Sequence, residues 1–560
     1  MHKALSSELA VNLDNQAVWN LKSKGDVTTS TVNSLTLSNQ SILDAGKYLT
    51  AADRANYTLK LSSDGTKTDG ALINGGIITM DNGSHNDVLT LEGSYVAKTG
   101  ATLRINTLWN TPGDENGINS ESDLFDIKGS AKGKTQVFSR TANTHQHDLI
   151  DGTIGSIAKD LNTNSAPIIR IHDPDNSDHH AFVGIAKTTG AGQLQLKEVD
   201  KVEKTGGKVR EYVWTLTVAN TDQPILEETI PSYAQMPLVN LEQGYSTLST
   251  LHSRRGENQV YGWDYCGSCG NDVTGQSWGR VSGSHLHVQG KTRLGYDAEM
   301  YSAQVGYDFA VQRTESKGHH VTGVYAAYTR ANADFFDDLR AENALVLADK
   351  YVGKGKATGW GLGLSHTRYA ANGSYVDLGG QVTFLSNKYT SRDLLEAKNK
   401  GVSYLVSAEV GRPFALGKHE KNQAGWLLEP QAQLSYQYLD MKSFNDGERE
   451  VEPGDMHGLR GRVGARLAYN QPAGYENLRT KTFYVTANLL HDFNRAKAVK
   501  IGEDKVRDKY EKTWWDIGLG IQHPVGQNAY VYLDVNYEGN FTGERRREGY
   551  RGAIGLKYNW

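Results

Sequence analysis

YRGAIGLKYNW, residues 550–560, is the stretch that decides the fold class of this chain. Successive side chains of a β-strand point to opposite faces, so alternate residues of this stretch share a face. One face is apolar and aromatic, with Tyr550, Gly552, Ile554, Leu556, Tyr558 and Trp560. The other face carries Arg551, Ala553, Gly555, Lys557 and Asn559. Such a two-faced strand occurs in soluble β-sandwiches and in membrane β-barrels, and the sequence upstream distinguishes the two.

Eleven further segments show the same period of two. With the last one, they begin near residues 277, 298, 319, 356, 374, 402, 425, 457, 481, 512, 527 and 549. Their number is even, their apolar faces end in aromatic residues, and short connections (370–373) alternate with long charged ones (331–355). Membrane β-barrels have these features, because short turns and long loops lie on opposite sides of the membrane. We therefore predict a 12-stranded antiparallel transmembrane β-barrel over residues 274–560.

The composition favours strands over helices and excludes some functions. The 560 residues include 60 Gly and 29 Tyr but only 11 Pro, and the net charge of −4 gives no indication of nucleic-acid binding. No run approaches the roughly 18 apolar residues that a membrane-spanning helix requires, whereas a barrel strand needs only ~9–11 residues. The N-terminal sequence MHKALSSELAVNLDNQ lacks the features of a signal peptide, so we expect an exported chain to be a fragment of something longer.

The first half of the chain is built of shorter strands. Alternating runs such as YTLKL (57–61) and DVLTL (87–91) are separated by Asn- and Gly-rich corners about twenty residues apart. Irregular repetition at this interval predicts a parallel β-helix. A β-sandwich is the alternative, although its strands usually follow one another every ~8–12 residues.

A helix is predicted between the two halves, at residues 237–255, PLVNLEQGYSTLSTLHSRR. Its apolar stripe, at the helical spacing of three and four, consists of Leu238, Leu241, Tyr245, Leu248 and His252. Pro237 suits a first helical turn and Gly256 suits the end. The segment would span about 28 Å, close to the ~30 Å of a hydrocarbon core. Because Asn240 and Glu242 make the other face polar, we expect the helix to lie inside a polar channel.

Charged residues on the polar faces of the strands would line the lumen. They are Asp377, Glu409, Glu429, Arg460, Arg462, Arg466 and Asp534. We expect them to pair with one another and with whatever fills the pore, and not to catalyse a reaction.

Cysteine and histidine residues offer few candidate sites. Cys266 and Cys269 form a CxxC pair, which can mark a redox or zinc site, but no second pair or redox-type βαβ pattern accompanies it. We interpret the pair as a local disulfide or as free thiols in a Gly-rich loop. HQHD (145–148) and HDPDNSDHH (172–180) have irregular spacing and lack the glycine and final glutamate of a calcium loop, so neither a metal nor a cofactor is expected.

Several ordered motifs resemble a known family. PSYAQMPLVNLEQGYSTLSTLHSRRGE (231–257), SWGRVSGS (277–284), LRGRVGARLAY (459–469) and the terminal YRGAIGLKYNW resemble the translocator of monomeric (type Va) autotransporters. Upstream, DVLTLEGSYVAKTGATLRINT (87–107) resembles the C-terminal end of a pertactin/AIDA-like passenger, which is a right-handed parallel β-helix. The resemblance implies a passenger with an autochaperone region at 1–225, a linker with a pore-spanning α-helix at 226–273, and the barrel at 274–560.

The family also implies a location and partners. The barrel would lie in the outer membrane of a Gram-negative bacterium as a monomer, with residues 1–225 at the cell surface. Its partners would be outer-membrane lipid, periplasmic chaperones and the barrel assembly machinery, which would read Ile554, Leu556, Tyr558 and Trp560 as an assembly signal. Some autotransporters cut themselves in the pore at an Asn-Asn pair, whereas here Leu241 follows Asn240 and that signal is absent. A different, acid-assisted cut is the alternative.

The activity of the passenger is less constrained by the sequence. No GDSL-like block, GDSG motif or nucleophile elbow is present, so an enzyme is not predicted. The leading hypothesis is an adhesin or aggregation factor that binds a host surface or neighbouring cells through an unidentified receptor. One alternative is a protease or esterase whose catalytic part lies upstream of residue 1, and another is an unrelated pore or lipid-modifying barrel.

Overall fold

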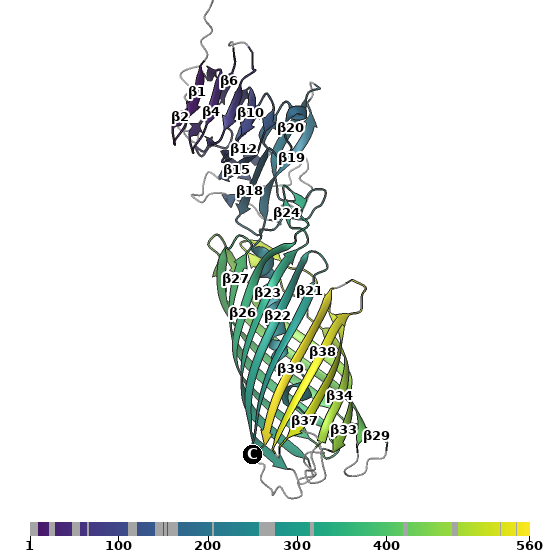
Figure 1. Ribbon diagram of the computed structural model, residues 1–560. Helices are drawn as coiled ribbons and strands as arrows, with labels where there is room; N and C mark the ends of the chain where they lie inside the picture. Colours follow the sequence, from purple (N-terminus) through teal and green to yellow (C-terminus); the bar gives the residue numbers. More distant parts are fainter. Residues whose placement is uncertain are drawn as a thin grey trace, which may run out of the picture. The chain divides into compact units, whose positions relative to one another are not determined.

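The structure is a computed structural model of the chain, and its elements divide into two compact units (Figure 1). The first unit comprises residues 1–227 with 339–349 and 502–504, and the second comprises 228–338, 350–501 and 505–560. The structure describes residues 9–21, 28–46, 56–63, 67–109, 120–140, 149–150, 154, 166–203, 206–256, 275–313, 318–417, 424–472, 480–494, 496–526, 528–544 and 546–559.

The second unit contains a closed barrel of twelve antiparallel strands, which confirms the predicted fold class. Each strand pairs with its neighbours along the chain. The ring closes where the last strand, β39, pairs with the first, β21, as in the register of Lys557 opposite Trp278. Closure matters because an open sheet edge would leave backbone N–H and C=O groups unpaired in lipid.

The twelve barrel strands begin close to the predicted positions. They are β21 (Gln276–Gln289), β22 (Leu294–Arg313), β23 (His319–Asp337), β26 (Tyr351–Tyr369), β27 (Tyr375–Ser391), β28 (Glu396–Gly411), β30 (Gly425–Met441), β33 (Gly454–Pro472), β34 (Thr480–Asp492), β37 (Thr513–Val525), β38 (Ala529–Asn540) and β39 (Arg547–Asn559). Short strands in the connections are β24 (Ala341–Glu342), β25 (Leu345–Val346), β29 (Phe414–Leu416), β31 (Phe444–Asn445), β32 (Glu450–Glu452), β35 (Val499–Ile501) and β36 (Asp504–Val506).

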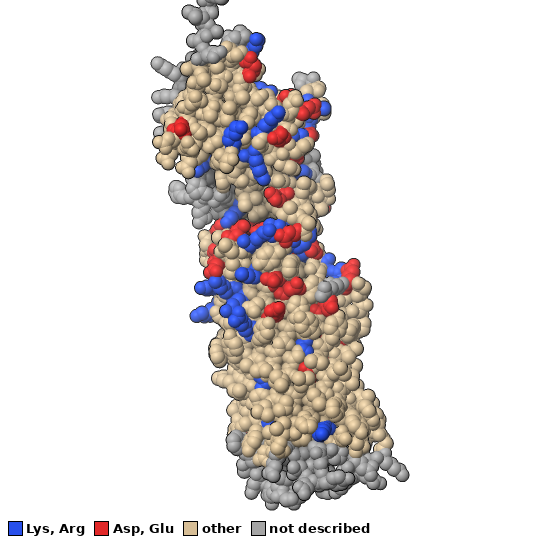
Figure 2. All heavy atoms as spheres, in the orientation of Figure 1, with Lys and Arg blue, Asp and Glu red and all other residues tan. Residues whose placement is uncertain are grey.

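The barrel strands turn their apolar residues outward. In β22, Val305 is 65% exposed, whereas its inward neighbours Gln304 and Asp308 are buried. Figure 2 shows few charged side chains over the middle of the visible barrel face and more of them near one end. An apolar outer band around a polar interior is the arrangement of a membrane barrel, the opposite of a soluble sandwich. No helix in the described ranges combines the length and the apolar character of a membrane span.

The first unit is a parallel β-helix, as predicted. Strands from successive coils stack in parallel and in register on three faces, and the second and third faces join into one sheet through β18–β20. On one face, inward residues stack as Leu43, Ile78, Leu103 and Val137. Parallel stacking at these long sequence intervals excludes the alternative of an antiparallel sandwich for these coils. The last strands, β18 to β20, pair antiparallel and end the coil.

The elements of this unit are mostly short. The first face has β1 (Ala10–Leu13), β4 (Ser34–Leu37), β7 (Ala71–Asn74), β10 (Ser94–Ala97) and β14 (Ala131–Lys132). The second has β2 (Val18–Asn20), β5 (Ile42–Asp44), β8 (Ile77–Thr79), β11 (Thr102–Trp109) and β15 (Thr135–Arg140), and the third has β3 (Thr29–Val32), β6 (Asn56–Leu61), β9 (Val88–Glu92), β13 (Leu124–Ile127) and β17 (Pro167–Ile171). The others are β12 (Ser120–Ser122), β16 (Leu149–Ile150), η2 (Pro174–Asn176), β18 (Phe182–Thr188), β19 (Gln193–Val202) and β20 (Lys208–Thr215).

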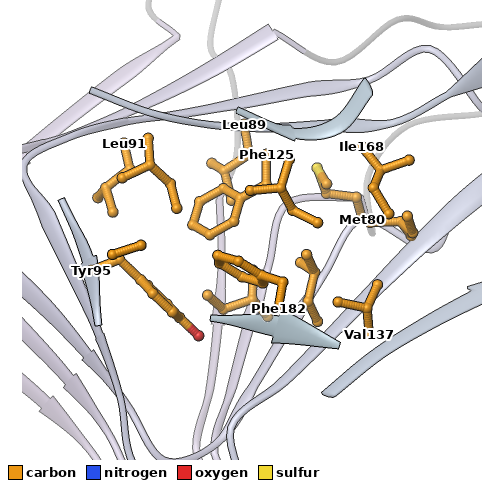
Figure 3. Packing of buried hydrophobic residues seen from close by; sticks show 14 of the residues in the cluster. Met80, Leu89, Leu91, Tyr95, Phe125, Val137, Ile168 and Phe182 are labelled. Carbon is orange, nitrogen blue, oxygen red and sulfur yellow. The ribbon is translucent and has the colours of Figure 1, made fainter. Parts of the chain in front are cut away.

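The core of the β-helix is a column of stacked apolar side chains (Figure 3). The ring of Tyr95 stacks on Phe182 at 5.4 Å and meets the edge of Phe125 at 5.7 Å. The Tyr95 hydroxyl accepts a hydrogen bond from Asn74 Nδ2 and lies 2.7 Å from the Thr135 hydroxyl, so this buried polar atom is satisfied. Burial raises the pKa of Tyr95 to about 12. Each coil therefore adds apolar burial to the coil before it.

Candidate functional site: a helix enclosed by the barrel

The predicted pore segment forms two helices, α1 (Ile230–Thr247) and α2 (Leu251–Arg255). The prediction of one helix beginning at Pro237 was wrong. Pro231 occupies the first turn, and Pro237 lies inside α1, where it removes one hydrogen bond of the helix. Leu248 to Thr250 separate the two helices, and the Thr250 hydroxyl caps α2 by accepting the backbone N–H of Ser253 at 3.3 Å.

The first turns of α1 contact two aromatic residues and a glycine of the barrel. Tyr233 meets Tyr389 and Phe444 edge to face, with ring centroids 5.1 and 5.2 Å apart. Met236 lies so close to Gly355 of β26 that a Cβ at this glycine would collide with its methyl group. A glycine in the barrel wall thus lets the helix approach closely.

The predicted apolar stripe of the helix packs against the barrel wall at two levels. Leu238 and Leu241 contact a cluster formed by Leu385, Leu439, Met441 and Met456. Tyr245 bridges this cluster to a second one, where Leu248 packs on Trp278, Tyr325 and Leu405. On the polar side, Gln243 Nε2 donates to Thr329 Oγ1 at 2.8 Å, and the amides of Asn240 and Asn387 are hydrogen-bonded.

Glu242 of α1 is the centre of one ion cluster in the lumen. Arg460 donates two hydrogen bonds to its carboxylate, at 2.9 and 2.7 Å, and Arg547 donates a third at 3.0 Å. The two guanidinium groups do not depend on Glu242 alone, because Arg460 also binds Asp492 and Arg547 also binds Glu538. The ring of Trp514 lies under both guanidinium groups, 4.7 and 3.9 Å from their central carbons.

A second ion cluster in the lumen holds α2 in place. Arg254 donates to Asp377 at 2.6 Å, and Arg255 donates to Asp308 at 2.5 Å. His252 Nε2 lies 2.8 Å from Oε1 of Glu429. These groups are almost fully buried, so their charges are held by partners and not by water.

The predicted lumen residues all lie on the inner wall and reach the helix or one another. Besides the pairs above, Glu409 accepts the backbone N–H of Leu251 at 3.1 Å, and Asp534 accepts the Ser253 hydroxyl at 3.0 and 3.1 Å. Arg462 lies 3.3 Å from Glu409, and Arg466 lies 3.5 Å from Glu429.

The sequence interpretation missed several members of these clusters. They are Arg254, Arg255, Arg280, Asp308 and Arg547, whereas Glu242 was predicted on the polar face of the helix without its partners. Arg280 belongs here because its guanidinium donates to Ser249 and to the Ser246 and Ser253 carbonyls. Their signal was present, since Asp308 and Arg280 fall on the inward face of their strands by simple alternation. Pairing of lumen charges with whatever fills the pore was expected, but the individual pairs could not be predicted, because they depend on how the helix is turned inside the barrel.

Other predicted sites are placed or left open by the structure. Ile554, Leu556 and Tyr558 project outward from β39 and are 47%, 52% and 39% exposed, while Trp560 lies outside the described residues. Cys266, Cys269 and residues 145–148 also lie outside them. Within the described ranges, no three His, Cys, Asp or Glu side chains are arranged to hold a metal ion, and His179 instead lies 2.6 Å from Glu198.

A closed twelve-stranded barrel with an apolar outer band and a helix ion-paired in its lumen defines an outer-membrane barrel with a filled pore. Residues 277–536 match the family model for the autotransporter β-domain. The barrel region thus matches autotransporter β-domains, which supports an outer-membrane protein that works as a monomer.

Two curated relatives agree with this family. The chain is 26% identical over 295 residues to the adhesin BmaC autotransporter of Brucella suis, covering 50% of this chain and 8% of that protein. It is 25% identical over 325 residues to the pertactin autotransporter of Bordetella parapertussis, covering 56% of this chain and 31% of that protein. The chain therefore spans less than a third of the length of these relatives.

Solved structures resemble the chain at lower identity. The transport unit of the autotransporter AIDA-I from Escherichia coli is 17% identical, with a TM-score of 0.47, and the match covers 60% of this chain and 99% of that one. The translocator domain of NalP from Neisseria meningitidis is 14% identical, with a TM-score of 0.37, and the match covers 59% and 99%.

Proposed function

We propose that the barrel secretes and displays its own N-terminal β-helix as a passenger at the cell surface. The observation that carries the proposal is the helical segment α1–α2, residues 230–255, which directly follows the β-helix in the chain and is bound inside the barrel by buried ion pairs. A chain that had left through this pore would end in such a position. The proposed regions are the passenger at 1–225, the linker with its helix at 226–273, and the barrel at 274–560.

The passenger's own folding can supply the direction of transport. No nucleotide or ion gradient is needed, because each coil that stacks outside the membrane buries apolar side chains such as Leu89, Tyr95 and Phe125. Burial of one such side chain is worth about 1.5–3 kcal/mol, so backward movement becomes unfavourable once several coils have formed. The C-terminal part of the β-helix, at about residues 85–218, would nucleate this folding.

We further propose that the passenger is an adhesin or aggregation factor. The name of the Brucella relative, an adhesin, supports this class, and no catalytic motif in the sequence supports an enzyme. Barrel assembly machinery, periplasmic chaperones and outer-membrane lipid are the proposed partners of the barrel, and a host or neighbouring cell surface is the proposed partner of the passenger.

Surface proteolysis tests display directly. Protease added to intact cells should remove residues 1–220 and leave a heat-modifiable barrel, while a periplasmic marker protein stays uncut. Protection of the N-terminal half in intact cells, with cleavage only after the outer membrane is opened, would refute display. Cell aggregation and binding to host cells test the adhesin class separately, and hydrolase activity in the shaved fragment would instead favour an enzymatic passenger.

A further inference from the structure

Six lysines stand close together on the outer wall of the barrel. They are Lys354 and Lys356 of β26, Lys388 of β27, Lys398 and Lys400 of β28, and Lys442 just after β30, and we call them the lysine patch. Figure 2 shows basic side chains gathered on this flank, near one end of the barrel where Figure 1 labels β26 and β27.

The register of the strands brings like charges together. Lys356 is directly opposite Lys388, and Lys388 is directly opposite Lys398. Lys442 donates its backbone N–H to the carbonyl of Lys400, so these two residues are also neighbours. Like charges directly opposite one another destabilise a sheet, unless an anion lies between them.

Nearby carboxylates compensate only part of this charge. Glu396 pairs with Lys388 at 2.5 Å, Asp334 is opposite Lys354, and Asp440 is exposed on β30. Among the described residues, Lys356 and Lys400 have no ion-pair partner within 4.0 Å. An excess of positive charge therefore remains on this flank.

The position of the lysine patch along the membrane normal indicates that it faces the lipid headgroups. Trp360 and Phe384 are opposite each other on the same outer face, 67% and 60% exposed, and Tyr404 of β28 is 48% exposed. Such aromatic belts mark the boundary between hydrocarbon and headgroups. Lys356 lies four residues beyond Trp360, which is about 10 Å along the membrane normal for a tilted strand.

This inference rests on the proposed function: with the β-helix displayed outside the cell, the end of the barrel at which the helical segment begins is the outer end, and this end carries the patch. It is the end where Tyr233, at the start of the helix, contacts Tyr389 and Phe444. We propose that the lysine patch binds the phosphate groups of an anionic glycolipid in the outer leaflet of the outer membrane. The ammonium groups project from the wall at headgroup depth, where phosphate oxygens accept charge-assisted hydrogen bonds. A soluble polyanion would not be held beside the lipid-facing belt.

Binding of purified lipid tests the proposal. The full chain in detergent is titrated with a bisphosphorylated glycolipid and with the same lipid after removal of both phosphates, and bound lipid is counted by native mass spectrometry. We expect binding of the phosphorylated form only, weakened by salt because the patch is exposed. The variant Lys356→Gln/Lys398→Gln/Lys400→Gln should bind roughly 100-fold more weakly, since each lysine near an anionic lipid surface contributes about a fivefold factor.

Matched controls separate the patch from general charge effects. Lys98→Gln/Lys132→Gln/Lys134→Gln removes the same charge from exposed positions of the β-helix and should bind like the wild type. Heat-modifiability of both variants shows that the barrel is folded. Equal binding of the dephosphorylated lipid, or patch-variant affinity within twofold of wild type, would overturn the proposal. Competition by millimolar inorganic phosphate, or equal binding of phosphatidylglycerol, would overturn the assignment to a glycolipid.

Discussion

The β-helix and the barrel use the same alternation of side chains with opposite orientation. In the β-helix, the apolar residues Leu91 and Phe125 point inward and are 0% and 1% exposed. In the barrel, Val305 and Leu362 point outward and are 65% and 68% exposed. Alternation alone therefore predicts strands, and only the surroundings of each face decide which side is apolar.

The two interiors are consequently stabilised by different interactions. The β-helix interior is filled by apolar side chains, whose attraction is non-directional. The barrel interior is filled by a helix and its ion pairs, which require both partners in one geometry. Substitutions in the β-helix should act through lost volume, and substitutions in the barrel should act through unpaired charge.

The largest effect is expected in the β-helix core. Phe125→Ala removes a ring that contacts Tyr95 and Phe182, and should lower the free energy of unfolding of the passenger by about 3–5 kcal/mol. Urea-dependent proteolysis of the displayed passenger on intact cells measures this change. Barrel heat-modifiability serves as the control and should not change, and an unaffected passenger would contradict the stacked core.

In the lumen, a substitution should also lower stability, but through an unpaired charge and not through lost volume. Asp377→Asn leaves Arg254 buried without its charged partner and should destabilise the folded barrel by about 3 kcal/mol. The temperature of the electrophoretic transition in detergent reports the loss. Adding Arg254→Met should recover part of it, because the unpaired charge is then absent. A double variant no more stable than Asp377→Asn would show that packing, not charge, holds α2.

The β-helix core buries the carboxyl group of Asp123, which is held by backbone hydrogen bonds, whereas lumen carboxylates such as Asp377 are held by ion pairs. Asp123 is fully buried and accepts the backbone N–H groups of Asp87 and Asn106. Burial raises the pKa of Asp123 to about 8, against these two hydrogen bonds. Since the unfolded carboxyl ionises near pH 3.8, the passenger should lose stability as the pH rises from about 4 to about 8.

Proteolysis of the displayed passenger in urea at pH 5 and pH 8 measures this dependence. The expected loss between the two values exceeds about 1 kcal/mol. Asp123→Asn keeps one acceptor oxygen but cannot ionise, so its stability should vary less with pH than that of the wild type. An identical pH profile for both proteins would show that another group titrates.

The sequence predicted the barrel more completely than the helix that fills it. The strand starts followed from a period of two, and the start of β30 at Gly425 was predicted at the same residue. The helix start was misplaced because Pro237 also fits a first turn, although Ala234 continues the apolar stripe four residues upstream of Leu238. The partners of Glu242 are more than 200 residues away in the chain, so no local pattern specifies them.

The smallest effect is expected for an ion pair on the outside of the β-helix. Lys60 and Glu92 are 4.0 Å apart on neighbouring coils, and their side chains are 24% and 37% exposed. Water already solvates both charges, so Glu92→Gln should change the free energy of unfolding by less than about 0.5 kcal/mol. The same change of one carboxylate to an amide is expected to cost several times more at Asp377, whose side chain is 6% exposed. Comparing the two in one proteolysis and heat-modifiability series tests whether burial, and not the number of ion pairs, determines what each charge contributes. Equal losses at both sites would show that the lumen is wetter than its side-chain burial indicates.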